Sequence, residues 1–474
     1  MYYYDFSIIL VVFRDNARRN MIHTILCRIN EGERPPYRRI LNAIERAIED
    51  GALNVGDRMP THRELCRALN VAVATVTRAY SEAERRGLLH SQVGSGTFVA
   101  QREKFRSPKT EAPSADYIDL AMYRMDVKST PAATTLFANI LKDLLQPAML
   151  NLYQPPFGDV DQRTAGASWL KHCGSDVAPQ NVIPSNGGQH GMLIAVAAST
   201  RIGEMILTEQ LTDPALKAVA LLLGRPLRGV ECDDEGMLPS DLERAVAESG
   251  AHTVFLTPTF HNPTTSTMSE QRRQDIAKVA RQLNLTVIES LMYVGLMKDP
   301  PKALASYIPE RTIVVGSLWQ VLGTSAKIGY VAGFSDIVDK LATAVSLSTG
   351  RVAAIPFQFG VKCILDGLIE PMVTAQRQEL QIRTALCRRL HGQAVSAPGN
   401  CVHAWLALPE PWRSDEFVEQ LREEGVMAAA THSFVVGRGQ SPHAIRLCIG
   451  TPTSADTLQL ALNKVAKLMS DRHI

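Results

Sequence analysis

Residues 36–99 read PYRRILNAIERAIEDGALNVGDRMPTHRELCRALNVAVATVTRAYSEAERRGLLHSQVGSGTFVA, and this stretch decides the fold of the N-terminal part of the chain. Apolar residues recur at helical spacing over 37–50, at Ile40, Ile44 and Ile48. That spacing is typical of an amphipathic helix, and the glycine that follows it is a common helix end. The stretch therefore opens with a predicted helix that buries one face.

Two further helices are expected next, joined by a short turn. Thr61 can cap a helix over 63–69, because Glu64 stands in its first turn as in a capping box. The following helix is predicted to begin near Val73 and to run to Arg86, where a glycine ends it. Two helices joined in this way form a helix-turn-helix, whose second helix enters the major groove of DNA.

A β-hairpin is predicted over Leu88–Val99, because the sequence alternates on both sides of the small residues Gly94-Ser95-Gly96. Small residues at the tip allow the backbone to approach phosphates or the minor groove closely. Charge supports such a partner: between Pro36 and Lys109 there are 13 Lys and Arg against 8 Asp and Glu. The local excess of +5 favours attraction to phosphates.

The ordered pattern D-R-M-P-T-x-R-E-L, T-V-T-R-A-Y-x-x-A-E-R-R-G-L-L and G-S-G-T-F-V resembles the winged helix-turn-helix of GntR-type bacterial regulators. The resemblance covers the whole module and implies binding to a double-stranded DNA operator. The DNA-contacting residues that it implies are Arg58, Thr61, Arg63, Thr75, Thr77, Arg78, Gly94, Ser95, Gly96 and Thr97. Taken singly, such residues also suit a solvated helix face. Many relatives begin the recognition helix with Ser-Arg, whereas this chain has Ala72-Val73, which removes a capping hydroxyl and an arginine.

The remaining chain alternates helical stretches with short β-rich runs. These runs lie at 205–208, 253–257, 286–290, 312–317 and 328–334. Buried apolar strands that alternate with helices predict an α/β fold with a mainly parallel sheet. Residues after about 375 show a fresh α/β pattern, which predicts a smaller C-terminal subdomain.

Five segments are therefore expected in this multidomain chain. They are an extension (1–33), a mainly α module with a β wing (34–100), a linker (101–117), a large α/β domain (118–374) and a small C-terminal domain (375–474). Phe6–Phe13 is an apolar run, too short to span a bilayer and without the features of a signal peptide. We expect a disordered or strand-like extension there, and Met21 is an alternative start.

The bulk composition is that of a soluble globular protein with two or three domains, because 45% of its 474 residues are hydrophobic. The eight cysteines have no metal-ligand spacing, so buried thiols in a reducing cytoplasm are expected, with no metal. We expect a cytoplasmic protein without a membrane partner.

Short matches in the large domain occur in the order of a known enzyme family. They are YQPPFG (153–158), SNGGQ (185–189), TPTFHNPT (257–264), IESLMY (288–293), GSLWQ (316–320), KIGY (327–330) and IRL (445–447). The series resembles the fold-type I aminotransferases, which have an α/β/α large domain and use pyridoxal phosphate. A GntR module fused to such a domain resembles the MocR group of regulators. That resemblance implies a homodimer formed by the large domains.

Several residues match the cofactor and substrate pocket of that family. Asn262 and Tyr293 match the pair that contacts the phenolic oxygen of the cofactor, and Arg446 matches the arginine that grips the substrate carboxylate. A strictly structural reading of Asn262 and Tyr293, as turn and strand-end residues kept for the fold, stays open.

The phosphate side of the pocket is also matched in part. Gly188 and Gln189 open a helix whose N-terminus favours an anion. Ser317 matches a serine that helps to hold the phosphate, although it too could be kept only for the fold. Lys327 replaces the phosphate-binding arginine as a point charge without the bidentate fork.

Three departures remove the reactive centre. Gln320 stands where the family has the Schiff-base lysine, and an amide cannot form an imine. Ser290 stands where a carboxylate holds the pyridine nitrogen cationic. No aromatic residue lies in 209–217, where the family stacks a ring on the cofactor. Lys327 is expected to face the phosphate and not to replace the lysine, so covalent binding of pyridoxal phosphate is not expected and no catalytic residue is assigned.

The leading hypothesis is a MocR-type transcriptional regulator whose aminotransferase-like domain binds an effector and dimerises without transaminase activity. The alternative is a pyridoxal phosphate-dependent aminotransferase with an N-terminal DNA-binding domain. The effector could be amino acid-like, held through Arg446 and Lys327, or a vitamin B6-like molecule held without a covalent bond. A domain that binds no cofactor and serves only for dimerisation is a further reading.

Overall fold

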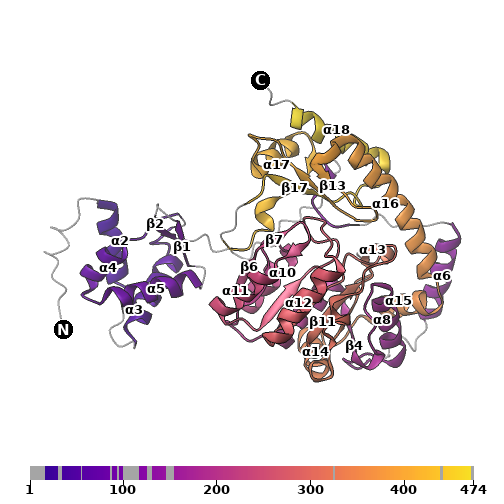
Figure 1. Cartoon of the computed structure of the whole chain (residues 1–474), viewed down its shortest axis with the longest axis horizontal. Coiled ribbons are helices and arrows are strands. Elements are labelled where there is room, and N and C mark those ends of the chain that lie inside the picture. The colour runs from indigo at the N-terminus through magenta and orange to yellow at the C-terminus, as the bar shows by residue number, and fades with distance from the viewer. Residues whose placement is uncertain are drawn as a thin grey trace. The chain divides into compact units, whose positions relative to one another are not determined.

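The computed structural model describes residues 16–29, 35–54, 56–85, 88–92, 96–99, 117–124, 131–145, 154–323, 326–437 and 441–470. The chain forms two compact units, residues 1–110 and residues 111–474, shown in Figure 1. Each unit has its own hydrophobic core.

The first unit is helical with a small sheet. Its described elements are α2 (Asn16–Leu26), α3 (Pro36–Glu49), α4 (His62–Leu69), α5 (Val73–Arg85), β1 (Leu89–Gln92) and β2 (Gly96–Val99). Strands β1 and β2 pair antiparallel. The helices pack around a core that contains the buried side chains of Ile44, Leu65, Val76 and Tyr80. The winged helix-turn-helix predicted for this part of the chain is therefore confirmed.

Helix α2 lies within residues 1–33, the stretch that was expected to be an extension of the module. Ile22 and Ile25 are fully buried, and α2 packs against α3 and α4. The spacing of Ile22, Ile25 and Leu26 is helical, and burial of that apolar face stabilises the helix against the module. The apolar run Phe6–Phe13 lies outside the described residues.

The second unit is organised around a seven-stranded sheet. Its strand order is β4 (Val182–Asn186), β12 (Ile328–Ala332), β11 (Thr312–Ser317), β10 (Thr286–Ser290), β9 (Thr253–Leu256), β5 (Ile206–Glu209) and β6 (Leu227–Val230). Only β12 runs antiparallel to its neighbours, β4 and β11. All five predicted β-rich runs become strands of this sheet, and the mainly parallel arrangement is confirmed.

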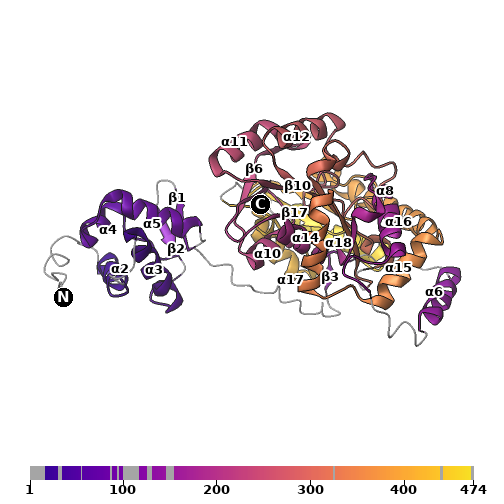
Figure 2. The same cartoon turned by 90° about the horizontal axis from the view of Figure 1, so that it is seen from below.

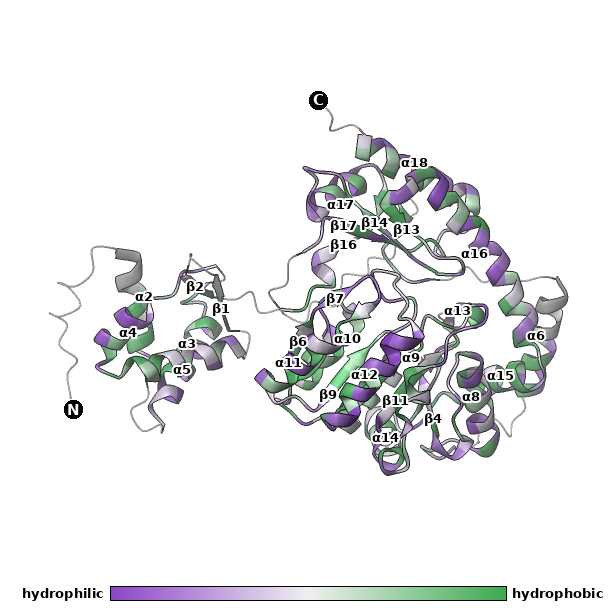
Figure 3. Cartoon of the chain, viewed as in Figure 1, coloured by the Kyte–Doolittle hydropathy of each residue, from purple (hydrophilic) through white to green (hydrophobic). Residues whose placement is uncertain are grey.

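Helices bury the sheet. The large-domain helices are α6 (Pro131–Leu144), α8 (Val160–His172), α9 (Gly187–Ser199), α10 (Pro214–Leu223), α11 (Pro239–Ser249), α12 (Glu270–Gln282), α13 (Trp319–Leu322), α14 (Ser335–Ser348) and α15 (Ala354–Leu365). Short connections are η1 (Pro179–Asn181), η2 (Leu304–Ser306), η3 (Pro309–Arg311), β7 (Cys232–Asp233) and β8 (Gly236–Met237). Successive residues of β5, β9, β11 and β12 are all buried, so both faces of the sheet are covered. Figure 3 shows this apolar character most plainly on β9.

The small domain packs long helices on a second sheet. Its elements are α16 (Ile369–His391), η4 (Gly392–Ala394), β13 (Val395–Ser396), β14 (Ala404–Ala407), α17 (Ser414–Glu423), β15 (Val426–Met427), β16 (Ala429–Ala430), η5 (Thr431–Ser433), β17 (Ala444–Leu447) and α18 (Ala455–Ser470). Helices α16 and α18 lie side by side in Figure 1.

At two expected domain limits, elements of the structure connect the large and small domains. β3 (Ile118–Asp119) pairs with β15, and Leu120 is buried in the core of the small domain. The segment that begins the second unit therefore belongs with its C-terminal part. At the other limit, α16 continues without interruption across residues 374 and 375, so no linker separates the two domains there.

No helix in the described residues is long and apolar enough to cross a membrane. All eight cysteines are unpaired. Five of them are buried as expected, but Cys66 and Cys232 are half-buried and Cys27 is exposed.

Candidate functional site

The candidate DNA-contacting surface begins with a capped helix. Thr61 Oγ1 accepts a hydrogen bond from Glu64 N at 3.3 Å, and Glu64 Oε2 accepts one from Thr61 N at 2.7 Å. The predicted capping box at the start of α4 is confirmed. Because both ends of the box are satisfied, the first turn of α4 is held in place, and Arg63 stands exposed on it.

The recognition helix α5 has one buried and one exposed side. Val76 and Tyr80 face the core, and the Tyr80 hydroxyl donates to Pro60 O at 2.8 Å. Thr77 and Arg78 are exposed, whereas Thr75 is half-buried. The predicted contact residues of α5 therefore include two that are free to reach a partner and one that is partly covered.

Intramolecular contacts pre-position some of these side chains. The guanidinium of Arg78 lies over the ring of Tyr37, 4.3 Å from its centroid. Thr77 Oγ1 lies 3.5 Å from His62 Nδ1. At the start of α5, Ala72 is exposed and Val73 is 47% exposed, so this end of the helix presents apolar groups.

The base of the wing lies beside Arg58. Arg58 forms an isolated β-bridge with Phe98, and Met59 N donates to Thr97 O at 2.8 Å. Gly96 has a φ of 120°, and a Cβ added there would lie 3.0 Å from Arg58 Nε. Glycine at 96 therefore lets Arg58 and the wing approach each other. Gly94 and Ser95, also predicted contact residues, lie outside the described residues.

In the second unit, three of the predicted pocket residues meet in one hydrogen-bond chain. Arg446 Nη1 donates to Asn262 Oδ1 at 3.0 Å, and Asn262 Nδ2 donates to the Tyr293 hydroxyl at 3.0 Å. The Tyr293 hydroxyl then donates to Asp213 Oδ2 at 2.5 Å. Asn262 and Tyr293 thus bond to each other and to two charged side chains.

The charges at the two ends of this chain are buried. Arg446 is 5% exposed and Asp213 is 6% exposed. Burial alone would lower the pKa of Arg446, but Cys448, Tyr123, Tyr293 and Asp213 nearby raise it, so the guanidinium stays charged. Burial raises the pKa of Tyr293 well above its ordinary value, with Asp213 adding to the shift. The tyrosine therefore acts as a neutral donor.

Aromatic rings and neutral histidines close the site. The Tyr123 ring lies 5.2 Å from Tyr293, 5.7 Å from Trp319 and 5.6 Å from His403, measured between centroids. Burial, followed by the charge of Arg446, lowers the pKa of His403 to about 3. Burial also lowers the pKa of His261 to about 4. Arg446 is therefore a cation in a site whose two histidines are neutral at pH 7.

Tyr123 is carried by a short segment attached to the small domain. Ala121 O accepts a hydrogen bond from Arg446 Nη2 at 2.5 Å, and Met122 O accepts one from Thr451 Oγ1 at 2.7 Å. Asp119 caps the preceding turn by accepting from Ala121 N at 2.8 Å. We name residues 118–124 the strap, because they tie the small domain to the site.

Gln320 is buried, and its side chain contacts the backbone of Tyr293. Its Nε2 donates to Tyr293 O at 3.2 Å, and its Oε1 is buried without a hydrogen-bond partner. A Cβ added at Gly295 would lie 3.1 Å from that Oε1. The amide is thus enclosed by protein, and it offers no primary amine for an imine.

Ser290 ends β10 with a hydroxyl that is buried and has no hydrogen-bond partner. A serine hydroxyl can donate a hydrogen bond to a ring nitrogen but supplies no negative charge to keep it protonated. Asp213 lies in the 209–217 stretch in which the family has its stacked ring. Sequence reasoning noted that this stretch has no aromatic residue but missed the aspartate, which is visible in EQLTDPALK.

The phosphate side of the pocket is only partly assembled. Ser317 Oγ donates to Ile328 O at 3.0 Å, so its proton is already used. A Cβ added at Gly188 would lie 2.3 Å from Met292 Sδ, so the thioether covers this glycine. Lys327 and Gln189 are exposed. The structure brings Gly188 and Ser317 together, while the two polar side chains extend to solvent.

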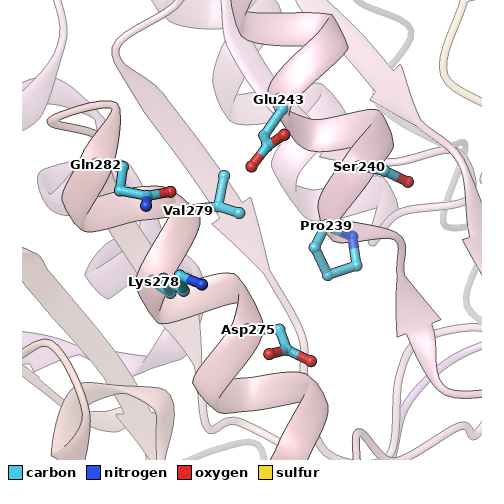
Figure 4. Close-up of a pocket in the computed structure, with 7 residues that line it drawn as sticks. All are labelled: Pro239, Ser240, Glu243, Asp275, Lys278, Val279 and Gln282. Atoms are coloured by element: carbon cyan, nitrogen blue, oxygen red, sulfur yellow. The ribbon is translucent and has the colours of Figure 1, made fainter.

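A separate surface pocket lies between α11 and α12, which are side by side in Figure 2. Figure 4 shows the residues that line it, namely Pro239, Ser240, Glu243, Asp275, Lys278, Val279 and Gln282. Its lining contains none of the predicted site residues and mixes both signs of charge. This pocket therefore contributes no residue to the site formed by the strap, Arg446 and Asp213.

Comparison with known proteins divides the chain in the same way. The family described as aminotransferase class I and II matches residues 115–465, and the family described as bacterial regulatory proteins, gntR family, matches residues 36–99.

Three relatives span nearly the whole chain. An HTH-type transcriptional regulator of Bacillus subtilis, YdeF, is 27% identical over 94% of this chain and 96% of its own length. The vitamin B6 salvage pathway transcriptional repressor PtsJ of Salmonella typhimurium is 26% identical over 89% and 96%. The HTH-type pyridoxine biosynthesis transcriptional regulator PdxR of Corynebacterium glutamicum is 24% identical over 90% and 94%.

Solved structures resemble the second unit. An archaeal alanine:glyoxylate aminotransferase has a TM-score of 0.69 and 24% identity, covering 75% of this chain and 91% of the other. Aspartate aminotransferase from Thermus thermophilus has a TM-score of 0.66 and 19% identity, covering 74% and 92%. These likenesses establish the fold of the second unit as that of fold-type I.

Proposed function

We infer that this chain, which belongs to the class I and II aminotransferase family and carries a gntR-type module ahead of that domain, is a DNA-binding transcriptional regulator of the MocR type. The observation that carries this function is the complete winged helix-turn-helix of residues 36–99, which we call the reader. It has a capped α4, an α5 with exposed Thr77 and Arg78, and a wing beside Arg58. Relatives that share both parts over nearly their full length are transcriptional regulators by name.

We propose that α5 enters the major groove and that Arg58, Arg63 and Arg78 contact phosphates and bases. All three guanidinium groups are exposed. Ala72 precedes α5 and Val73 begins it, so the base contacts at that end are apolar, and a thymine methyl group suits them. We assign the remaining predicted contacts to positioning of the DNA backbone, namely Thr61, Thr75, Thr77, Gly94, Ser95, Gly96 and Thr97.

The test is an electrophoretic shift with DNA from upstream of the chain's own gene. Binding is expected to weaken steeply with salt, because cationic side chains release counterions from DNA. An Arg63→Ala, Arg78→Ala double variant is expected to bind at least about tenfold more weakly. The control removes two exposed arginines of the second unit, Arg201→Ala and Arg413→Ala, which changes the net charge equally. Equal binding by the two double variants would contradict the proposed contacts.

We propose that the second unit is an effector-binding and dimerisation module without transaminase activity. The absence of an amine at Gln320 and of a carboxylate at Ser290 supports this proposal. Pyridoxal phosphate held as an imine does not fit these residues. The effector is a small molecule, amino acid-like or vitamin B6-like. The second class is suggested by two relatives whose names refer to vitamin B6 salvage and pyridoxine biosynthesis.

The competing function is a pyridoxal phosphate-dependent aminotransferase with an N-terminal DNA-binding domain. The retained Asn262, Tyr293 and Arg446 favour it. Transaminase turnover that is lost in Lys327→Ala would establish this function, because Lys327 would then be the reactive amine. We expect no transaminase turnover in the parent protein or in Lys327→Ala.

A further inference from the structure

Arg78 is one of the arginines that we assign to DNA contact, and an aromatic ring holds its side chain. Its guanidinium carbon lies 4.3 Å from the centroid of the Tyr37 ring. Within the described residues, this stack is the contact that the Arg78 side chain makes, and no hydrogen-bond acceptor or carboxylate binds it there. Its charge and its donors are therefore unused inside the first unit.

Tyr37 is fixed by the start of α3 and by the core. Pro35 stands at the N-cap of that helix and Pro36 at its first position, where proline restricts the backbone. The Tyr37 ring is half-buried and packs against the apolar core of the first unit. Helices α3 and α5 pack against each other, so the ring meets Arg78 from a rigid base.

Arg78 lies next to the buried face of the recognition helix. The side chains of that face are Val76, Ala79, Tyr80 and Ala83. Helix α5 begins at Val73, so Arg78 is in its second turn and is exposed. This is the end of a recognition helix that enters the major groove.

A ring restrains a guanidinium without using its hydrogen-bond donors. The attraction acts on the flat face of the guanidinium, while the N–H donors point outward in its plane. A carboxylate at the same place would occupy donors and neutralise the charge. Tyr37 therefore limits the motion of Arg78 and leaves its charge and its donors available to DNA.

Restraint before binding favours specific binding. A free arginine side chain loses rotamer freedom when it is fixed on a partner, whereas a stacked one has less freedom to lose. A guanidinium held in one plane also suits two parallel hydrogen bonds to one pair of acceptors, which is the geometry of specific arginine contacts with DNA. Charge-driven binding to any duplex does not depend on this geometry.

We propose that Tyr37 is a positioning residue for DNA recognition, whose ring holds the guanidinium of Arg78 in the orientation that contacts DNA. The proposal rests on the proposed function, in which Arg78 is a DNA contact. It adds a residue of α3 that acts through Arg78 and contributes to specific affinity. If the stack instead kept Arg78 away from DNA, removal of the ring would strengthen binding.

The experiment measures DNA affinity of the full-length protein by fluorescence anisotropy, with a labelled duplex from upstream of the chain's own gene. Tyr37→Leu removes the ring but keeps an apolar side chain against the core, and Tyr37→Phe keeps the ring. We expect Tyr37→Leu to bind about three- to fivefold more weakly, which is the loss of a cation–π contact at an exposed site, and Tyr37→Phe to restore the affinity. Affinity for a scrambled duplex and the salt dependence of binding should not change, because no charge is removed.

A double-mutant cycle separates positioning from folding. Once Arg78→Ala has removed the guanidinium, Tyr37→Leu should cause no further loss of affinity. The matched control cycle combines Tyr37→Leu with Arg63→Ala, since Arg63 makes no contact with Tyr37 in the described part of the reader. In that cycle the two losses should multiply. Thermal unfolding of every variant is measured alongside, because damage to the fold would lower the affinity in both cycles alike.

The outcomes separate this inference from the proposed function. Unchanged or tighter binding by Tyr37→Leu would overturn the inference, and so would equal further losses in the Arg78→Ala and Arg63→Ala backgrounds. A loss in Tyr37→Phe as large as that in Tyr37→Leu would also overturn it, because the hydroxyl and not the ring would then be responsible. If the parent protein binds DNA and Tyr37→Leu behaves like it, the regulator stands and the role of Tyr37 is wrong. A parent protein that binds no DNA would overturn both.

Discussion

Replacement of Tyr293 by phenylalanine tests the hydrogen-bond chain that joins Arg446 to Asp213. The substitution removes one hydroxyl and leaves the ring in place. That hydroxyl donates to Asp213 at 2.5 Å and accepts from Asn262 at 3.0 Å. Tyr293 is 4% exposed and Asn262 is fully buried, so water cannot easily replace the lost partner.

The expected loss follows from these two bonds. A hydrogen bond to a charged group contributes about 1.5–3 kcal/mol, and one between neutral groups about 0.5–1.5 kcal/mol. Tyr293→Phe should therefore lower the free energy of unfolding by about 2–4 kcal/mol. For a unit of roughly 360 residues this corresponds to a fall in Tm of about 3–5 °C, from the average entropy of unfolding per residue.

Tyr330→Phe is the matched control. Tyr330 is fully buried in the same unit, but its hydroxyl has no hydrogen-bond partner. Removing an unsatisfied hydroxyl should leave the Tm unchanged or raise it. The assay is thermal unfolding of both full-length variants, followed by tryptophan fluorescence and calorimetry. Equal losses in the two variants, or no loss in Tyr293→Phe, would refute the energetic role of the chain.

Two further predictions concern the reader and the pH dependence of the second unit. Ile25→Ala should destabilise the first unit by about 2–4 kcal/mol, because Ile25 is fully buried in its core; unchanged resistance of the reader to limited proteolysis would show that α2 does not belong to it. Burial raises the pKa of Glu209 from 4.5 to about 7. Its contribution to stability is therefore complete below pH 4.5 and is lost as pH rises through 7, by about 3 kcal/mol in all. Glu209→Gln should flatten this dependence in urea unfolding measured between pH 5 and 8, and an unchanged slope would assign the effect to another group.

Local patterns predicted the reader and the sheet well. The capping box is contained in four consecutive residues, from Thr61 to Glu64, and its geometry depends on them alone. The strands of the central sheet are short apolar runs, because both faces of such a sheet are covered. Each of these features is determined within a few residues, so periodicity and capping rules suffice.

Such local rules cannot predict contacts between residues that are far apart in the sequence. Asn262 and Arg446 are separated by 184 residues and Tyr293 and Asp213 by 80, and no spacing along the chain indicates that they bond. The pairing of β3 with β15 likewise joins residues about 300 positions apart, so no local rule relates the strap to the small domain. Helix α2 was missed for a different reason. Its apolar face is short, and its stability comes from packing against α3 rather than from its own sequence.

The retained pocket residues make contacts within this chain. Asn262 and Tyr293 match residues that contact a cofactor, yet here they bond to each other and to buried charges of this chain. Ser317 likewise donates to a backbone carbonyl. These residues therefore have a structural use that requires no cofactor, and their presence alone does not establish one.

We propose that this DNA-binding regulator has the shape of an aminotransferase without its covalent anchor. The most direct measurement is mass spectrometry of the full-length protein after incubation with pyridoxal phosphate and reduction with borohydride, with digestion to locate any adduct. We expect no stoichiometric adduct at any lysine, and the same result in Lys327→Ala. A single stoichiometric pyridoxyl-lysine that disappears in Lys327→Ala would contradict it.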